Sequence, residues 1–412
     1  MTFSPPHHKP GVDMGTHDFE AEIDTRALRA WRLGRIQEQL RKRGLGGVLL
    51  YDPVNIRYAT GGRNMMIWTM HNAARYVFVP AAGKSIMFEF PGCAHLAEGL
   101  DTLAEVRTST GFLFAGGDRR NRRVRQWVGE ILELVRTYCG ADRRLAADHV
   151  DVEAGQVLVA EGVRLVEGQS LMEQARCIKS PEEISVMSLA IGVAETACAR
   201  IREALEPGRT EAQMWSILQA TNAEMGGEYI ETKLLTSGAR TNPWFQEAGE
   251  KRIRPGDLVS FDTDLVGPFG YDADMSRTYF CGPGRPSGKQ RELYGLAFDE
   301  VHHNMSLLKA GLSFRDYAER AWEAPPNFHK NWYNGLIHGI GLCNEYPVLS
   351  KRFLEFDDAS EAGFEENMLV CVESYIGEDD GVEGVKLEQM VRITATGVEL
   401  MTTYPFDEQL LA

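Results

Sequence analysis

Four aspartates lie in one stretch of the chain, residues 258–280, whose apolar residues predict two strands joined by a Gly-Pro-Phe-Gly turn. Alternate side chains of an extended strand share a face, so Asp262 and Asp264 are expected to point the same way, and so are Asp272 and Asp274. Like charges this close repel, so up to four clustered carboxylates need either a cation between them or bound protons. The stretch therefore predicts a metal site, with a solvated acidic hairpin as the alternative.

Three later residues supply the groups that would complete such a site. His338 lies between glycines, Glu373 is predicted to close an apolar strand, and Glu388 follows Val385-Lys386-Leu387. A buried charge without a partner is disfavoured, and a cation would supply the partner of each glutamate. Carboxylates with a single imidazole suit manganese, iron, cobalt or zinc, and carboxylates that bridge are expected of a two-metal centre.

The elements around these residues predict α+β structure with antiparallel strands in the second half of the chain. Ser180 is expected to cap a helix that runs to about Leu205, and Thr210, with Gln213 in capping-box position, begins a second helix that ends near Gly226. Further helices are predicted over residues 288–309 and from residue 314, and further strands over residues 230–236, 368–373 and 386–394.

In the first half, helices alternate with strands, which is typical of an α/β layered domain. Helices are predicted over residues 25–44 and 122–138, and strands over residues 47–51, 76–79 and 85–90 and around residue 145. We therefore expect an irregular extension over residues 1–24, an α/β domain over residues 25–172 and a metal-binding domain over residues 173–412.

Composition bounds the partners. The 412 residues carry a formal charge of -15, which argues against a nucleic-acid partner because there is no basic excess to neutralise phosphates. The basic run over residues 119–125 is interpreted as the solvated face of a helix. The seven cysteines are scattered and odd in number, so we expect reduced thiols in a cytoplasmic protein that has no membrane partner.

The order of these motifs resembles the pita-bread metallopeptidase superfamily of creatinase, prolidase and aminopeptidase P. The resemblance rests on Asp-x-Ser-Arg-Thr at residues 274–278, His-Gly-Ile-Gly from His338, and the two glutamates. Residues 176–184 resemble the start of the pita-bread domain, and residues 52–58 resemble the amino-terminal domain of the superfamily. The resemblance implies an α+β chain with a C-terminal pita-bread (creatinase/aminopeptidase) domain, preceded by a smaller α/β creatinase-type N-terminal domain.

Two features differ from the peptidases and resemble the dimethylsulfoniopropionate lyase branch most closely. Glu345 stands where the peptidases have a second histidine, and the spacing of the hairpin aspartates is altered, as a bulge would alter it. The branch implies a homodimer, a small carboxylate substrate, and two divalent transition-metal ions, with iron as the metal and manganese, zinc or cobalt as alternatives. The metal-binding positions that it implies are Asp262, Asp264, Asp274, His338, Glu373 and Glu388.

The branch also implies the residues around the substrate. Trp68 and Tyr333 correspond to aromatic residues that line its pocket, and Trp244 is a further candidate to hold a sulfonium cation against a ring face, with core packing as the alternative for all three. The catalytic base of the branch is an aspartate, and Asn344 stands in its place. An amide cannot accept that proton, so Glu345, ionised Tyr333 or a metal-bound hydroxide remain as candidate bases.

Three functions stay open on these residues. The first is a lyase that cleaves the C–S bond of dimethylsulfoniopropionate to give dimethyl sulfide and acrylate. The second is an Xaa-Pro peptidase or related amide hydrolase with a dinuclear metal centre. The third is a metal-binding relative without catalysis.

Overall fold

The computed structural model describes residues 23–111, 120–333, 335–350 and 362–412. The chain divides into two compact units between Arg176 and Cys177, and each unit is described by itself. The boundary predicted between residues 172 and 173 falls within helix α7 (Gln169–Arg176) of the first unit. Most of the extension predicted over residues 1–24 lies outside the described residues.

The first unit, Asp24–Arg176, contains a six-stranded mixed sheet in the order β4-β3-β2-β1-β5-β6. The pairs β1–β2 and β2–β3 are antiparallel, and the pairs β3–β4, β1–β5 and β5–β6 are parallel. The strands are β1 (Gly47–Leu50), β2 (Tyr76–Pro80), β3 (Ser85–Glu89), β4 (Leu103–Thr108), β5 (Arg144–Ala147) and β6 (Arg164–Glu167).

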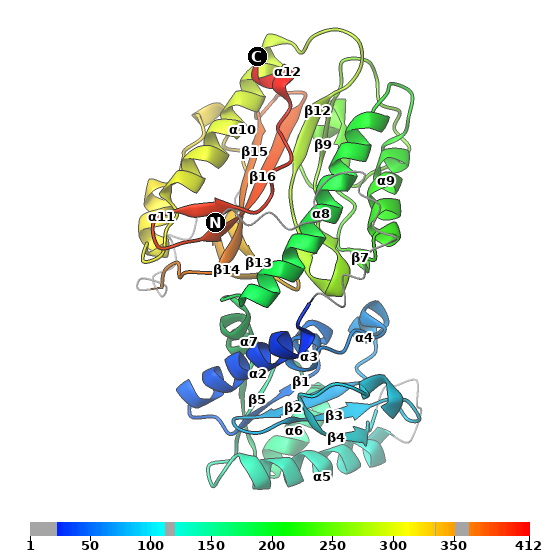
Figure 1. The fold of residues 1–412 in the computed structure, drawn as a ribbon, viewed down its shortest axis with the longest axis vertical. Coiled ribbons are helices and arrows are strands. Elements are labelled where there is room, and N and C mark those ends of the chain that lie inside the picture. The colour runs from blue at the N-terminus through cyan, green and yellow to red at the C-terminus, as the bar shows by residue number, and fades with distance from the viewer. Residues whose placement is uncertain (1–22, 112–119, 334, 351–361) are drawn as a thin grey trace. The chain divides into compact units, whose positions relative to one another are not determined.

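Helices cover both sides of this sheet, with α2 and α5 on opposite sides (Figure 1). Helix α5 buries Trp127, Ile131 and Val135, which lie four residues apart and so share one face against the sheet. The predicted α/β layering is therefore confirmed. The helices are α2 (Thr25–Lys42), α3 (Pro53–Thr60), α4 (Met66–His71), α5 (Arg120–Tyr138), α6 (Val152–Ala160) and α7.

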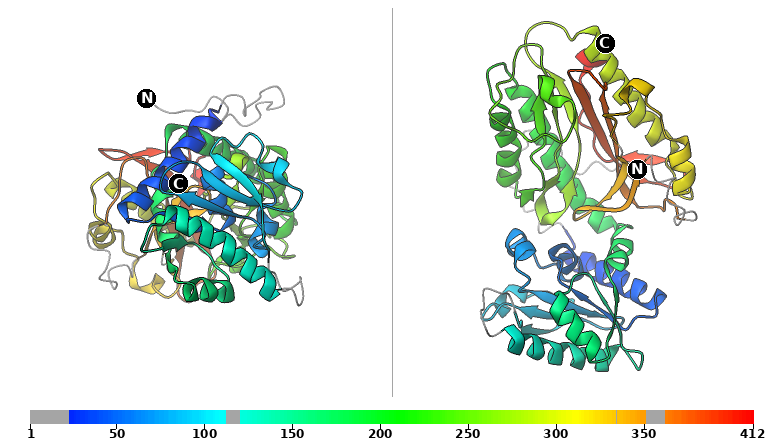
Figure 2. Two further views of the ribbon diagram at one scale, coloured as in Figure 1. Left: turned by 90° about the horizontal axis from the view of Figure 1, so that it is seen from below. Right: turned by 180° about the vertical axis from the view of Figure 1, so that it is seen from behind.

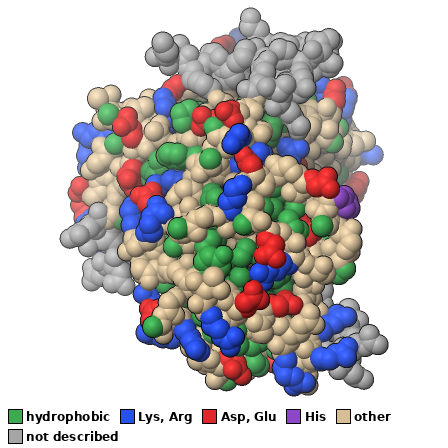
Figure 3. Space-filling view, turned by 60° about the horizontal axis from the view of Figure 1, so that its bottom comes forward, with side chains coloured by type: hydrophobic (Ala, Val, Ile, Leu, Met, Phe, Trp, Pro, Cys, Tyr) green, Lys and Arg blue, Asp and Glu red, His purple; other side chains and the backbone are tan. Residues whose placement is uncertain are grey.

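The basic run at the start of α5 behaves as a solvated, paired surface. Arg120 forms ion pairs with Asp151 and Glu153 at 2.8 and 2.9 Å, and Arg122 and Arg125 are exposed. On the face of the molecule drawn in Figure 3, basic and acidic side chains are interspersed. The start of α5 is therefore the solvated face of a helix, as predicted.

The second unit, which contains Cys177–Ala412, is built from antiparallel strands, as predicted. Its sheets have the orders β11-β10-β7, β12-β9-β8 and β14-β13-β15-β16-β17. The strands are β7 (Tyr229–Ile230), β8 (Leu235–Ser237), β9 (Leu258–Phe261), β10 (Leu265–Val266), β11 (Asp272–Ala273), β12 (Arg277–Phe280), β13 (Gly335–Ile340), β14 (Asn344–Ser350), β15 (Leu369–Gly377), β16 (Gly384–Ile393) and β17 (Val398–Leu400).

Within this unit, helices α8 and α9 lie on one side of the strands and α10 and α11 on the other (Figures 1 and 2). The predicted N-cap at Ser180 and the predicted capping box at Thr210 are both confirmed, and Ser180 also forms a capping box with Glu183. The helices are α8 (Pro181–Ala204), α9 (Glu211–Glu224), α10 (Gly288–Leu307), α11 (Phe314–Arg320) and α12 (Glu408–Leu411).

Helix α8 is long and apolar enough to cross a membrane. However, 78% of that apolar window is buried inside the protein. Its apolar residues therefore serve as the core of this unit, where it packs against α9 and against the strand β11.

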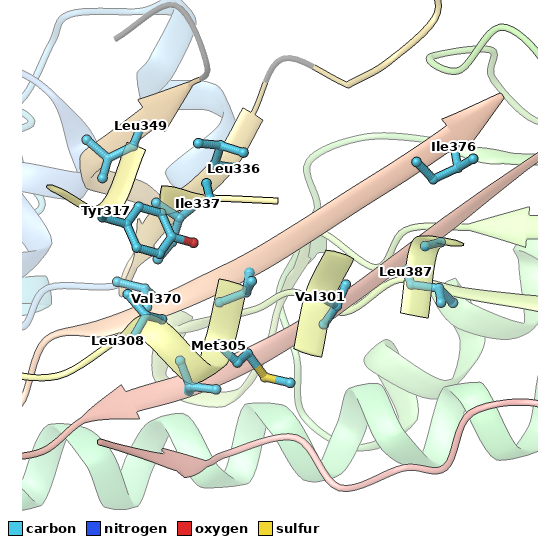
Figure 4. Close-up of a cluster of buried hydrophobic side chains, with 14 of the residues drawn as sticks. Val301, Met305, Leu308, Tyr317, Leu336, Ile337, Leu349, Val370, Ile376 and Leu387 are labelled. Carbon is cyan, nitrogen blue, oxygen red and sulfur yellow. The ribbon is translucent and has the colours of Figure 1, made fainter. Parts of the chain in front are cut away.

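The main core of this unit lies between α10 and one face of the five-stranded sheet (Figure 4). Val301 and Met305 of α10 belong to the same buried cluster as Val370 of β15 and Leu387 of β16. Because side chains alternate along a strand, the residues next to these in sequence point to the other face of the sheet. That other face carries the polar residues described next.

Candidate metal centre

Strands β15 and β16 place two glutamates side by side on the face opposite the core. Glu373 and Glu388 are directly paired in the antiparallel register, and both are buried. Like charges directly opposite each other destabilise a sheet unless something compensates them. The prediction that Glu373 closes its strand is wrong, because β15 continues to Gly377. Glu373 therefore lies inside the strand, with strand residues before and after it.

The hairpin predicted over residues 258–280 is present, with an interruption where its aspartates lie. Strands β9 and β12 pair at one end and β10 and β11 at the other, and both ends share one register. The expected bulge is therefore replaced by a gap of equal length in the two strands. Thr263 bridges the gap, since its hydroxyl donates to the carbonyl of Ala273 and accepts from the N–H of Met275.

Three of the four hairpin aspartates meet at this gap. Asp262, Asp264 and Asp274 each bring a carboxylate oxygen within 4.8 Å of the others. Asp264 has a φ of 35°, and its N–H donates to Asp274 Oδ1 at 3.1 Å. Asp272 is fully buried but lies outside this group, because it belongs to β11 and pairs with Val266 one step farther along the ladder.

His338 joins the glutamates to the hairpin. It lies on β13 opposite Cys371, and its Nε2 is 3.3 Å from Glu388 Oε1, 3.4 Å from Glu373 Oε1 and 3.8 Å from Asp274 Oδ2. Its Nδ1 is 3.0 Å from the carbonyl oxygen of Gly339. A proton on Nδ1 shared with that carbonyl would leave the lone pair of Nε2 directed at the carboxylates, which is the arrangement of a metal-ligating histidine.

The hairpin carboxylates are arranged so that they retain protons unless a cation is present. Burial raises the pKa of Asp274 well above its ordinary value, and the carboxylates of Asp262 and Asp264 raise it further. Burial and the charge of Asp262 raise the pKa of Asp264 to about 7. A divalent ion placed among these oxygens would compete with those protons.

The imidazole is held in its charged form by the glutamates. Burial lowers the pKa of His338, but the hydrogen bond to Glu388 and the charge of Glu373 outweigh it and raise this pKa to about 10. Burial raises the pKa of Glu388, but the Lys386 ammonium and His338 outweigh it and lower this pKa. In the charged imidazole, Nε2 carries a proton. This proton must leave before Nε2 can bind a metal ion.

The donor set fits divalent transition-metal ions. Besides the three aspartates, two further groups bring their ligand atoms within 4.8 Å of one another, namely Asp262 with Glu373 and Glu388, and His338 with Cys371 and Glu388. These groups bring together all six residues that the sequence predicts as metal-binding. Carboxylates with one imidazole and a nearby thiol suit iron, manganese, cobalt or zinc.

Two residues at this site were not predicted from the sequence. The alternation of side chains along a strand would have indicated them, because residues two apart share a face. Lys386 lies two residues before Glu388 and Cys371 two residues before Glu373, so each shares the face of its glutamate. Lys386 Nζ is 2.7 Å from Glu373 Oε2 and 3.2 Å from Glu388 Oε2. The cluster thus contains a cation of its own.

Of the predicted aromatic residues, the structure brings Tyr333 to the cluster. The Lys386 ammonium lies 5.4 Å from the centre of the Tyr333 ring. Trp244 is 6% exposed and stacks on Tyr375 at 5.9 Å, which is core packing. Trp68 belongs to the first unit, where it is 47% exposed and packs edge-on against Phe90 at 5.3 Å.

The two predicted catalytic residues of β14 have different surroundings. Asn344 is exposed, and its side chain makes no hydrogen bond to another described residue. Glu345 is 2% exposed; its Oε2 is 3.0 Å from Lys179 Nζ, and its Oε1 accepts from the N–H of Leu342. The carboxylate of Glu345 is therefore held by a lysine rather than brought into the metal-ligand groups.

This combination of a creatinase-type α/β unit and an antiparallel unit with a carboxylate and imidazole cluster defines the pita-bread class of proteins. The chain belongs to metallopeptidase family M24, whose sequence profile matches residues 185–395. The profile of the Creatinase/Prolidase N-terminal domain matches residues 32–178. Members of this family generally use divalent metals, in agreement with the donor set described above.

Within the superfamily the chain lies near the dimethylsulfoniopropionate lyase branch. It is 36% identical over 394 residues to dimethylsulfoniopropionate lyase DddP of Roseovarius nubinhibens, which covers 94% of this chain and 88% of that protein. It is 35% identical to the protein of the same name from Roseobacter denitrificans, with the same coverage. The prolidase structure from Pyrococcus horikoshii OT3 has a TM-score of 0.74 at 20% identity, covers 91% of this chain and 99% of that one, and shows the shared fold.

Proposed function

We propose that the protein is a metal-dependent lyase that cleaves dimethylsulfoniopropionate into dimethyl sulfide and acrylate. The observation that carries the proposal is the likeness to two lyases of that name along nearly the whole chain, together with the converging acidic cluster. In this reaction a base removes a proton from the carbon next to the carboxylate. The electrons of that C–H bond form the double bond, and the C–S bond breaks with its electron pair leaving on sulfur.

We propose that the six predicted residues, Asp262, Asp264, Asp274, His338, Glu373 and Glu388, hold two divalent ions. Iron is the first candidate, and manganese, zinc and cobalt suit the same ligands. Bound ions would supply positive charge that receives the substrate carboxylate and stabilises the negative charge that develops beside it. The carboxylates would release their protons to bind these ions, as their raised pKa values require.

Among the candidate bases, Tyr333 has the best position. Asn344 cannot accept a proton, and Lys179 holds the carboxylate of Glu345. Burial and the charge of Glu373 raise the pKa of Tyr333, while Lys386 lowers it. Divalent ions would cancel the raising effect of the carboxylates, so we propose that Tyr333 Oη takes the substrate proton in the metal-loaded protein.

A second candidate function is hydrolysis of Xaa-Pro dipeptides. The match to metallopeptidase family M24 over residues 185–395 favours it. Against it, Glu345, where the peptidases have a second histidine, is tied to a lysine and cannot act as a neutral imidazole does.

One incubation separates these functions. The purified, metal-loaded protein is given dimethylsulfoniopropionate or a panel of Xaa-Pro dipeptides, with Asp274→Asn as the control that loses a ligand carboxylate. Dimethyl sulfide released by the wild type and not by Asp274→Asn supports the lyase. Free proline released from the dipeptides supports the peptidase. If neither forms but Asn344→Asp cleaves dimethylsulfoniopropionate, the pocket persists and the present substrate differs. No product from any of these proteins refutes the lyase and favours a metal-binding relative without catalysis.

We also propose a cytoplasmic homodimer. All seven cysteines are free, as expected of a reducing compartment, and the near full-length likeness to the lyases supports a shared assembly. Light scattering of the purified chain tests the dimer, and a mass of one chain, 46.0 kDa, would contradict it.

A further inference from the structure

The ammonium group of Lys386 is buried inside the acidic cluster. The side chain is 0% exposed, and its Nζ lies 2.7 Å from Glu373 Oε2, 3.2 Å from Glu388 Oε2 and 3.3 Å from Asp262 Oδ2. It also donates to the hydroxyl of Ser276 at 2.8 Å. Three of the proposed metal ligands therefore share one internal cation.

Lys386 and His338 divide the oxygens of the two glutamates between them. The ammonium contacts the Oε2 atom of Glu373 and of Glu388, whereas His338 Nε2 faces their Oε1 atoms at 3.4 and 3.3 Å. One oxygen of each glutamate is thereby fixed, and the other is left on the side of the imidazole. A buried ammonium held in this way orients carboxylates without occupying the imidazole side of the site.

The charge of the five ligand carboxylates favours a cation in addition to two divalent ions. The ligand groups contain five carboxylates, Asp262, Asp264, Asp274, Glu373 and Glu388. Two divalent ions would leave one negative charge uncompensated in a buried site. The ammonium of Lys386 cancels that charge, so an anionic substrate group would meet a neutral centre rather than a negative one.

We propose that Lys386 is a positioning residue that fixes the Oε2 atoms of Glu373 and Glu388. Its ammonium also supplies the positive charge that allows the metal centre to bind the carboxylate group of a substrate. The inference rests on the proposed metal centre and carboxylate substrate. It adds a specificity for anionic substrates that depends on the charge of one side chain.

The test compares Lys386→Met, which removes the charge, with Lys386→Arg, which keeps it. Lys251→Met is the matched control, because Lys251 Nζ lies 2.7 Å from both Asp257 Oδ2 and Ser237 Oγ, outside the cluster. Each full-length protein is loaded with manganese, counted by elemental analysis and titrated calorimetrically with propanoate at saturating manganese. Propanoate supplies a carboxylate that cannot be cleaved, so the readout does not depend on turnover.

We expect Lys386→Met to bind propanoate about tenfold or more weakly than the wild type, because one unit charge is lost from a buried site. Lys251→Met should bind it as the wild type does, and Lys386→Arg should bind it more tightly than Lys386→Met because the positive charge is kept. Wild-type affinity in Lys386→Met, or an equal loss in Lys386→Arg, would overturn the proposal. If Lys386→Met does not fold, Lys386→Arg still decides by its retention or loss of binding. A wild-type protein that takes up no manganese would instead refute the proposed metal centre.

Discussion

At the scale of single residues, neighbours on one strand have opposite environments. Asn344 is exposed, whereas Glu345 is buried and bonded to Lys179. Both residues were predicted to be catalytic because they stand where relatives have functional groups. The structure gives Glu345 a structural contact, since removal of one partner from a buried ion pair leaves an uncompensated charge.

Replacing Glu345 by Gln should therefore destabilise the protein more than it alters the metal centre. Loss of the buried partner of Lys179 is expected to lower the free energy of unfolding by about 3–5 kcal/mol. Denaturant unfolding measures this loss. In the control Glu224→Gln the lost partner is an exposed glutamate, 63% exposed at its side chain and paired with Arg200, and the loss of stability should be much smaller because water screens an exposed ion pair. Equal effects in the two variants would contradict the structural role of Glu345.

Replacing Tyr333 by Phe tests the proposed base. Loss of the hydroxyl should lower kcat for dimethyl sulfide release by about a hundredfold or more, with little change in metal content. Tyr375→Phe is the control, because the Tyr375 hydroxyl donates to the carbonyl of Thr241 and lies in the core. Unchanged kcat in Tyr333→Phe would assign the proton to another group.

Metal affinity should rise with pH. A proton occupies Asp264 below about pH 7 and His338 below about pH 10, and each must leave before a metal ion binds. Below pH 7 each bound proton that is displaced weakens the affinity by about tenfold per pH unit. Manganese titrations from pH 5.5 to 8.5 measure this slope. It should flatten in Asp264→Asn, and an affinity independent of pH would contradict protonated ligands.

The same carboxyl contributes to the pH dependence of the stability of the metal-free fold. Because the pKa of Asp264 is raised above its ordinary value of 3.8, the folded chain binds a proton there that the unfolded chain releases. This contribution to stability is present at low pH and is lost as pH rises through about 7.

At the scale of elements, the sequence predicted the long helices correctly, because their caps and periodic apolar residues are local signals. It did not predict several of the short strands. The N-cap of α8 at Ser180, the capping box of α9 at Thr210 and the helix α5 were predicted from local sequence, and the structure confirms them. The strand predicted over residues 230–236 divides into β7 and β8, because Glu231, Thr232 and Lys233 lie between two different sheets. Strands β13 and β14 were missed, since glycines obscure the alternation on β13 and pairing across the sheet, rather than local sequence, holds it.

The sequence predicted the metal-ligating residues of the site. It did not predict the lysine whose charge compensates the carboxylates. Acidic residues and one histidine in a recognisable order indicated the metal centre, but Lys386, between Val385 and Leu387, was given no role. Its role depends on which face of β16 it occupies, and that face is set by the register with β15.

Replacing Thr263 by Val tests whether the hairpin gap depends on its hydroxyl. The loss leaves the carbonyl of Ala273 and the N–H of Met275 without this buried partner, which should cost about 1–3 kcal/mol in the free energy of unfolding. Thr263→Ser keeps the hydroxyl and should retain most of the stability and the metal content. If Val and Ser behave alike in thermal unfolding, the hydroxyl bridge does not hold the gap.

At the scale of the whole molecule, the two units have different sheets and different cores. The first is a mixed sheet between helices, and the second carries every residue of the three metal-binding groups. The profile of the Creatinase/Prolidase N-terminal domain matches residues 32–178, and the profile of metallopeptidase family M24 matches residues 185–395 in the second unit. The central claim is that this second unit gathers carboxylates and one imidazole from separate segments around two divalent ions.

Anomalous diffraction from crystals grown with manganese tests that claim most directly. We predict two anomalous peaks per chain and their loss in Asp274→Asn. The side chains that should surround the peaks are those of Asp262, Asp264, Asp274, His338, Glu373 and Glu388. No peak within reach of these side chains at saturating manganese, or peaks that remain unchanged in Asp274→Asn, would contradict the account.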